Sequence, residues 1–156
     1  MLIYFAGPLF SQAEKQFNLS LTEKLEKKGF QVFLPQRDGV ENSKSCHKDL
    51  SKEERRKILF NLDKEKILQS DIFLFILDGR VPDEGACVEL GIAYTQKELM
   101  KKKKLLIGLM TDTRAAFIKG KLNPMIKVPL DKIAETEEEL FTTLSNYKKN
   151  FVGSKS

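Results

Sequence analysis

The sequence predicts an α/β fold in which a five-stranded parallel sheet lies between two layers of helices, as a three-layer sandwich. Short apolar segments of strand length alternate with longer helical segments from one end of the chain to the other. Capping patterns mark the starts of two of those helices. The length of 156 residues, with 41% hydrophobic and 31% charged residues, fits one domain. We therefore expect a single domain over residues 1–150 and a frayed tail at 151–156.

The expected strands are short and mostly apolar, as buried parallel strands are. They cover residues 2–6, 30–34, 71–77 and 105–110, with a weaker pattern at 132–134. After its first residue, the segment 71–77 is a continuous apolar run. It breaks into an acidic, glycine-containing loop at 78–83, and a helix follows.

Helices are expected in the intervening segments, at residues 11–28, 51–69, 85–103 and 137–149. In the first of them apolar residues recur every four positions, and Gly29 follows, which suits a helix carboxyl terminus. The second and the last open with capping-box patterns, Ser51 with Glu54 and Thr136 with Glu139.

This alternation requires right-handed crossovers, and the simplest arrangement is the flavodoxin-like, Rossmann-like strand order 2-1-3-4-5. In that order the first and third strands are neighbours whose connections leave toward opposite faces of the sheet. A crevice then forms over the loops 6–9 and 78–83, and open α/β sheets bind ligands at such a crevice. Residues 36–50 are polar and predicted to be irregular.

The composition argues against a membrane or a nucleic acid polymer as a partner. The longest apolar stretches have strand length, and the chain opens on the strand-like segment 2–5, so we expect a cytoplasmic protein. The net charge is +5, and its densest run, Lys101 to Lys104, is expected to end a helix and complement its dipole. No aromatic residues are interleaved with these lysines, as a single-strand stacking surface would require.

We expect neither a metal nor an organic cofactor. Cys46 and His47 are adjacent, but one cysteine and one histidine cannot supply the three or four ligands of a zinc site. The loop at Gly7 permits close approach of a ligand, yet it lacks the dinucleotide glycine pattern and a Walker lysine. Because His47 is the sole histidine and falls in an irregular segment, a Ser-His-Asp triad is not supported.

Glu89 is the first candidate for chemistry. Its helical neighbours three and four positions away are all small or apolar: Gly85, Ala86, Ile92 and Ala93. A carboxylate on such a face is costly to bury without a partner or a task. The alternative is an ordinary glutamate near the start of a helix, which the helix dipole favours.

Asp83 and Asp63 are the other acidic candidates. Asp83 precedes the helix that carries Glu89; it suits an N-cap, and capping is compatible with lining the crevice. Asp63 shares an apolar helix face with Ile67, and its alternative is a boundary residue paired with Lys66 or a nearby lysine. A site built from carboxylates alone suits retaining glycosyl transfer, in which one carboxylate attacks the anomeric carbon and another acidic group manages the leaving-group proton.

Five stretches of the sequence together resemble one enzyme family. They are YFAGPLFS at 4–11, FLPQRDG at 33–39, DGRVPDEG at 78–85, ELGIAY at 89–94 and NPMI at 123–126. These stretches resemble nucleoside 2-deoxyribosyltransferases, and the similarity runs from residue 2 to about residue 145. The central Asp-x-Gly-x-x-x-Glu-x-Gly pattern is shared with the related deoxynucleoside 5′-monophosphate N-glycosidases.

The resemblance implies exchange of nucleobases on 2′-deoxyribose, in nucleoside salvage, by a double displacement with retention. It implies Glu89 as the nucleophile at C1′, with Asp63 and Asp83 contacting the base or the sugar and assisting proton transfer. The pocket would further include Tyr4, Gly7, Phe10, Gln36 and Asn123. The partners would be 2′-deoxynucleosides, free nucleobases and further copies of the chain in a dimer or hexamer.

Two alternatives remain open at this point. One is hydrolysis of a 2′-deoxynucleoside 5′-monophosphate, which would require backbone amides, serines or an arginine around the phosphate. The first loop loses an amide at Pro8 and offers only Ser11, which disfavours hydrolysis of a phosphorylated substrate. The other alternative is a non-catalytic nucleotide-sensing module with the same fold.

Overall fold

The computed structural model describes residues 1–39, 50–112 and 122–153, and it contains the sheet that the sequence predicts. The strands are β1 (Leu2–Ala6), β2 (Gln31–Phe33), β3 (Ile72–Ile76), β4 (Leu105–Leu109) and β5 (Lys132–Ala134). All neighbouring strands are parallel, and their order, β2-β1-β3-β4-β5, confirms the flavodoxin-like arrangement. β3 is buried along its whole length, as expected of a strand covered on both faces.

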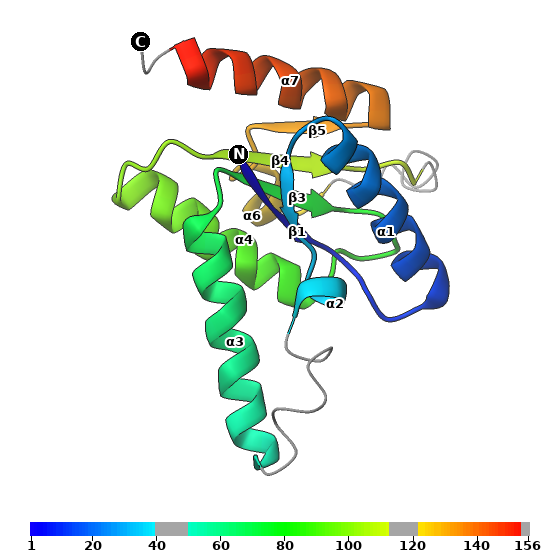
Figure 1. Ribbon diagram of the computed structural model, residues 1–156, viewed down its shortest axis with the longest axis vertical. Coiled ribbons are helices and arrows are strands. Elements are labelled where there is room, and N and C mark those ends of the chain that lie inside the picture. The colour runs from blue at the N-terminus through cyan, green and yellow to red at the C-terminus, as the bar shows by residue number, and fades with distance from the viewer. Residues whose placement is uncertain (40–49, 113–121, 154–156) are drawn as a thin grey trace.

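Helices cover both faces of the sheet (Figure 1). On one face lie α1 (Gln12–Lys27) and α7 (Glu137–Gly153), and on the other lie α3 (Lys52–Gln69) and α4 (Glu84–Leu99). Two short helices, α2 (Pro35–Asp38) and α6 (Pro124–Lys127), follow β2 and precede β5. Because strand side chains alternate between the faces, Tyr4, Phe33 and Phe73 all belong to the core between the sheet and α3 and α4.

The predicted helix ends are confirmed at several positions. Ser51 and Glu54 form the expected capping box at the start of α3. Ser11 and Glu14 form a second one at the start of α1, which sequence analysis did not single out. Gly29 follows α1 with a φ of 77°, a backbone conformation that favours glycine.

The end of α4 differs from the prediction. The sequence predicts a helix through residue 103, but α4 ends at Leu99, and Lys101 adopts a φ of 51°. The lysines that follow contact α3 instead of ending α4. Lys102 and Lys104 donate hydrogen bonds to carbonyls in the last turn of α3, those of Leu68 and Ile67. Their charges therefore complement the negative carboxyl end of the α3 dipole.

Two segments that were expected to be irregular or frayed contain helix in the structure. Residues 35–38 form α2, which begins with a proline at its first helical position, where the missing N–H costs nothing. Residues 40–49, with Cys46 and His47, lie outside the described residues. α7 runs through Gly153, so it takes in the first part of the expected tail, and residues 154–156 lie outside the description. Within the described chain no helix is long and apolar enough to cross a membrane.

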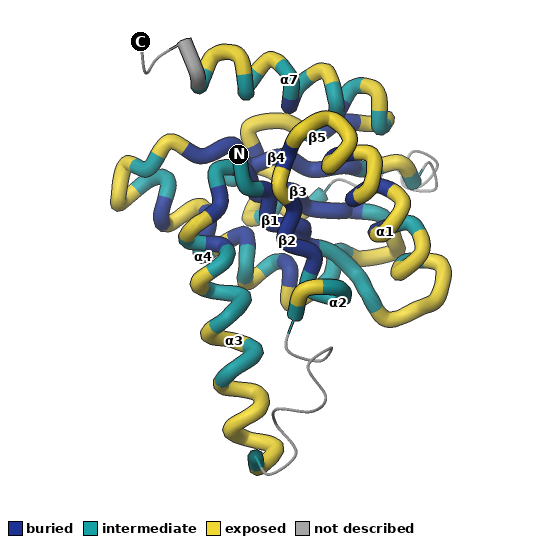
Figure 2. The backbone as a smooth tube through the Cα atoms, viewed as in Figure 1, coloured by how far each residue is buried: buried dark blue, intermediate teal, exposed yellow. Residues whose placement is uncertain are grey.

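The carboxyl ends of β1 and β3 lie side by side, with Ala6 opposite Phe75. Gly7 follows β1 directly, and a Cβ at this position would lie 2.8 Å from the Cβ of Ile76. A glycine is therefore required for the first loop to pass so close to β3. Figure 2 shows that the amino-terminal half of α3 extends away from the sheet and is exposed, whereas its last turns approach the core.

Candidate active site

A buried tyrosine and a glutamate meet between β1 and α4. The Tyr4 hydroxyl donates a hydrogen bond to Glu89 Oε1 over 2.7 Å. The ring of Tyr4 is fully buried and stacks against Phe33, at 5.7 Å between ring centroids, and Phe73, at 5.8 Å. Since three neighbouring strands supply these rings, the Tyr4 hydroxyl is held in place by the sheet itself.

Glu89 projects from the buried side of α4, toward the sheet. Burial raises the pKa of its carboxyl to about 7; the Tyr4 hydrogen bond lowers that pKa, while the negative charges of Asp63 and Asp83 raise it. A carboxyl group with this pKa exchanges its proton near neutral pH. Perturbed carboxyl groups of this kind mark candidate catalytic sites.

Asp63 reaches the same region from α3. Burial raises the pKa of its carboxyl to about 6. Its charge also raises the pKa of both Tyr4 and Glu89. The structural alternative was an ion pair with Lys66, but Lys66 Nζ donates to Gln69 Oε1 instead, over 3.3 Å. Among the described residues Asp63 forms no ion pair.

Asp83 has the capping role that the sequence allowed. Its Oδ1 accepts a hydrogen bond of 2.8 Å from the Ala86 N–H, so it is the N-cap of α4. Its charge also acts on the Glu89 carboxyl, whose pKa it raises. The cap fixes the first turn of α4 and thereby the direction in which Glu89 leaves the helix. Asp63 of α3 and Asp83 at the start of α4 thus both act electrostatically on the carboxyl group that Tyr4 contacts.

The family model described as nucleoside 2-deoxyribosyltransferase matches residues 3–146 of the sequence. This chain belongs to the nucleoside 2-deoxyribosyltransferase family. Members of that family act on nucleosides and nucleobases. Apart from Leu2 of β1, the match covers all five strands, and it includes Glu89, Asp63 and Asp83, so the candidate site lies inside the region that defines the family.

Two solved structures resemble the fold of this nucleoside 2-deoxyribosyltransferase family member. A conserved protein from Enterococcus faecalis V583 is 30% identical, with a TM-score of 0.70, over 96% of this chain and 98% of that chain. The 2-deoxyribosyltransferase from the psychrotolerant bacterium Bacillus psychrosaccharolyticus is 23% identical, with a TM-score of 0.70, over 90% of each chain. At that identity the second similarity shows the fold. The search of curated proteins found no match.

The other expected pocket residues of this family member are Phe10, Gln36 and Asn123. Phe10 lies in the loop after β1 and is 74% exposed. The Gln36 amide accepts from Asn18 Nδ2 (3.0 Å) and donates to the Lys15 carbonyl (2.8 Å), so its hydrogen bonds hold it against α1. Asn123 caps the short helix α6 by accepting from the Met125 N–H over 2.9 Å, and its side chain is on the surface.

Sequence reasoning missed two features of the site. The rings of Phe33 and Phe73 hold Tyr4, although the sequence alone marks them only as core residues. Asn18 is buried on α1 and donates hydrogen bonds to the Pro8 carbonyl (2.9 Å) and to Gln36. It therefore ties the first loop to the segment after β2. A polar residue next to the apolar stripe of the first helix was the available signal for Asn18.

Proposed function

We propose that the protein transfers 2-deoxyribose between nucleobases by a retaining double displacement, with Glu89 as the nucleophile. The observation that carries this proposal is the buried Glu89 carboxyl, held by Tyr4 within reach of the charges of Asp63 and Asp83. A buried carboxylate of this kind suits attack on an electron-poor anomeric carbon, and the family supplies the substrate class.

In the first step a Glu89 carboxylate oxygen forms a bond to C1′ of a 2′-deoxynucleoside while the C1′–N bond to the base breaks. The bonding electrons leave with the base, which receives a proton from an acidic group of the site. In the second step a nitrogen of an incoming base attacks C1′ from the face that the first base left, and the Glu89 ester bond breaks. The N–H proton of the incoming base passes to the acidic group that gave up its proton in the first step, so both carboxyl groups return to their starting forms. Two inversions at C1′ give net retention.

We assign the proton of the leaving base to Asp63. Burial raises its pKa to about 6, so this carboxyl holds a proton closer to neutral pH than an ordinary aspartic acid does. Asp83 is the positioning residue, because its Oδ1 is engaged by the Ala86 N–H at the start of the helix that carries Glu89. Its negative charge adds to the field that stabilises positive charge on the sugar in the transition state.

The assignment of Glu89 and Asp63 predicts a bell-shaped pH profile. Glu89 must be ionised to attack while Asp63 carries a proton, so the active form is the singly protonated pair with its proton on Asp63. Because Glu89 has the higher pKa, this form is the smaller fraction of that pair. With pKa values of about 6 for Asp63 and about 7 for Glu89, kcat/KM is expected to peak between these values and to fall on both sides. Initial rates of base exchange across this range measure the profile. A rate that keeps rising well above pH 8 would contradict the shared proton.

Tyr4→Phe is expected to change the pH profile as well as the rate. The substitution removes one hydrogen bond to a carboxylate, worth roughly 1.5–3 kcal/mol, so kcat/KM should fall roughly tenfold to a hundredfold. Because that hydrogen bond lowers the Glu89 pKa, its loss moves the alkaline limb to higher pH. A purely structural role for Tyr4 would lower activity and leave both limbs where they are. The measurement is kcat/KM as a function of pH for the wild type and for Tyr4→Phe.

A direct test of the activity is to incubate the protein with a 2′-deoxynucleoside and a different free base. The proposal predicts a new nucleoside with the β configuration of the donor, and none when a ribonucleoside is the donor. Release of free base that needs no acceptor, from a 5′-monophosphate in particular, would support the hydrolase instead. The Ser11 hydroxyl accepts a hydrogen bond from the Glu14 N–H, as the N-cap of α1. This engages the one serine of the first loop that could contact a phosphate and disfavours the hydrolase. Nucleoside binding without any turnover would support a sensor.

A further inference from the structure

A hollow of about 600 Å³ lies between α7 and the carboxyl end of α1. Its volume is in the range of small-molecule sites in proteins, roughly 300–1,000 Å³. α1 and α7 cover one face of the sheet, whereas α3 and α4, which carry Asp63 and Glu89, cover the other (Figure 1). The hollow is therefore separate from the candidate active site.

One stripe of α7 lines most of the hollow. After Glu137, the lining residues of this helix recur at intervals that place them on one helix face: Glu138, Phe141, Thr142, Ser145, Asn146 and Lys149. Lys28, the C-cap of α1, lies across from this stripe. A second hollow of about 480 Å³ shares Lys28, Ser145 and Lys149 with the first and adds Phe30 and Lys148. The two hollows are thus continuous around three lysines.

Aromatic rings hold two of the three lysine ammonium groups. Lys28 Nζ lies 4.7 Å from the centre of the Phe141 ring, and Lys148 Nζ lies 4.8 Å from the centre of the Phe30 ring. Within residues 1–39, 50–112 and 122–153, neither these two lysines nor Lys149 forms an ion pair. Each ammonium group has three N–H donors, so the rings leave donors for an anion.

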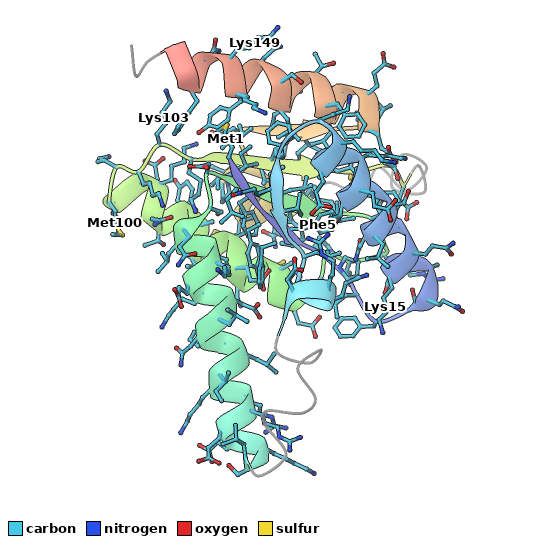
Figure 3. All side chains as sticks on the ribbon, viewed as in Figure 1. Met1, Phe5, Lys15, Met100, Lys103 and Lys149 are labelled. Carbon is cyan, nitrogen blue, oxygen red and sulfur yellow. The ribbon has the colours of Figure 1, made fainter. Side chains whose placement is uncertain are left out.

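Helix dipoles account for only part of this positive charge. A cation near a helix carboxyl end is favourable, which explains Lys28 and the hydrogen bond of 3.0 Å that Lys148 Nζ donates to the Gly29 carbonyl. It does not explain Lys149, labelled in Figure 3 on α7. This helix continues through Gly153 and has no basic residue in its last turn.

The carboxylates of the hollow lie toward the amino end of α7. Glu137 Oε2 forms an ion pair of 2.7 Å with Lys24 of α1, so its charge is balanced. Glu138 has no ion pair within the described chain. It lies about 16 Å along the helix from Lys149. The hollow therefore has a positive end around the three lysines and a hydrogen-bond acceptor at its other end.

We propose that this hollow binds a sugar phosphate, with the phosphate group among Lys28, Lys148 and Lys149. Phosphate oxygens accept several charge-assisted hydrogen bonds at once, which three ammonium groups at one place can supply. Ser145 lines both hollows with Lys28 and Lys149, and its hydroxyl is a further donor for the phosphate.

The remaining lining of the hollow suits the sugar. Sugar hydroxyls both donate and accept hydrogen bonds, as do the Thr142 hydroxyl and the Asn146 amide, and the Glu138 carboxylate accepts them. A bare phosphate ion would leave most of the volume unfilled, and Glu138 would repel it. The ligand is a free sugar phosphate or the same unit within a nucleoside 5′-monophosphate. This inference goes beyond base exchange and does not rest on it.

The test is isothermal titration calorimetry of the full chain with 2-deoxyribose 5-phosphate and with a 2′-deoxynucleoside 5′-monophosphate. Lys28→Gln and Lys149→Gln each remove one charge from the hollow, and each is expected to raise the dissociation constant roughly tenfold or more. Lys149→Arg keeps the charge and should keep most of the affinity. Lys27→Gln is the matched control, because Lys27 is exposed on α1 and does not line the hollow. Circular dichroism and thermal unfolding establish that each variant is folded.

Binding of either ligand that both glutamine substitutions in the hollow weaken, and Lys27→Gln does not, is the supporting result. The tighter of the two ligands then identifies the source of the sugar phosphate. Inorganic phosphate bound as tightly as both would overturn the proposal, because the lysines would then hold an ion only. No binding at millimolar ligand, or binding unchanged in both variants, would also overturn it. These measurements do not involve base exchange, so the proposed reaction is tested separately.

Discussion

Glu89→Gln is expected to abolish base exchange, with kcat/KM falling on the order of 10³-fold or more, because the nucleophile of the double displacement is removed. The amide of glutamine has nearly the shape of the carboxylate and can still accept the hydrogen bond that the Tyr4 hydroxyl donates. The loss should therefore be in turnover, and nucleoside binding should remain. Initial rates and equilibrium titration with a 2′-deoxynucleoside separate the two effects.

The same variant is expected to be more stable than the wild type above pH 7. Burial raises the pKa of Glu89 from an ordinary value near 4.5 to about 7, so the folded protein loses stability as pH rises through that range. At roughly 1.4 kcal/mol per pKa unit, the cost reaches about 3.5 kcal/mol at most and is complete above pH 7. Glutamine does not ionise, so the difference in unfolding free energy should be small near pH 4.5 and largest near pH 8.

Glu84→Gln is the matched control for both measurements. Glu84 lies on the same helix and is exposed, so its substitution should change neither the rate of base exchange nor the pH dependence of stability appreciably. A Glu89→Gln variant that still exchanges bases at a tenth of the wild-type rate would contradict the role of Glu89 as nucleophile. Chemical denaturation at the two pH values measures the stability difference.

Asp63→Asn is expected to have the second-largest effect. Without a proton donor for the leaving base, kcat/KM should fall about 10²- to 10⁴-fold, the range typical of general acid catalysis. The alkaline limb of the pH profile should disappear, because no proton on residue 63 remains to be lost. The remaining limb should report the Glu89 carboxyl alone and lie below about pH 7, since the Asp63 charge no longer raises the pKa of Glu89.

The identity of the leaving base provides a further check on Asp63. A base that leaves readily without protonation should react with the variant at a rate closer to that of the wild type. Glu65→Gln serves as the control, because Glu65 is an exposed carboxylate on the same helix. An Asp63→Asn variant that slows all bases equally and keeps both pH limbs would show that Asp63 is not the proton donor.

The sheet could be predicted from the sequence because each core strand is a short apolar run between polar residues. The segment expected at 71–77 is observed as Ile72–Ile76, and Asp71 belongs to the preceding turn, where it accepts a hydrogen bond of 2.9 Å from the Leu2 N–H. The end of α4 was wrong by four residues, because Lys102 and Lys104 bind the end of α3. Such a contact between distant segments leaves no local pattern.

The candidate site was predictable where a charged residue interrupts an apolar face. Glu89 and Asp63 both have this signature, and both have raised pKa values in the structure because of burial. Asp83 was ambiguous in the sequence because capping α4 and lining the site require the same residue type. The position of Gln36 could not be predicted, since it depends on contacts with Asn18 and the Lys15 carbonyl across the fold.

The most direct test is whether Glu89 carries the sugar as a covalent ester. The protein is incubated without an acceptor base with a 2′-deoxynucleoside bearing fluorine at C2′, which slows breakdown of the ester by withdrawing electrons from C1′. Mass spectrometry of the quenched protein and its peptides should find one fluorinated deoxyribosyl group on the peptide that contains Glu89, and none in Glu89→Gln. A sugar attached to another residue, or base exchange at the full rate with no adduct at Glu89, would contradict the mechanism.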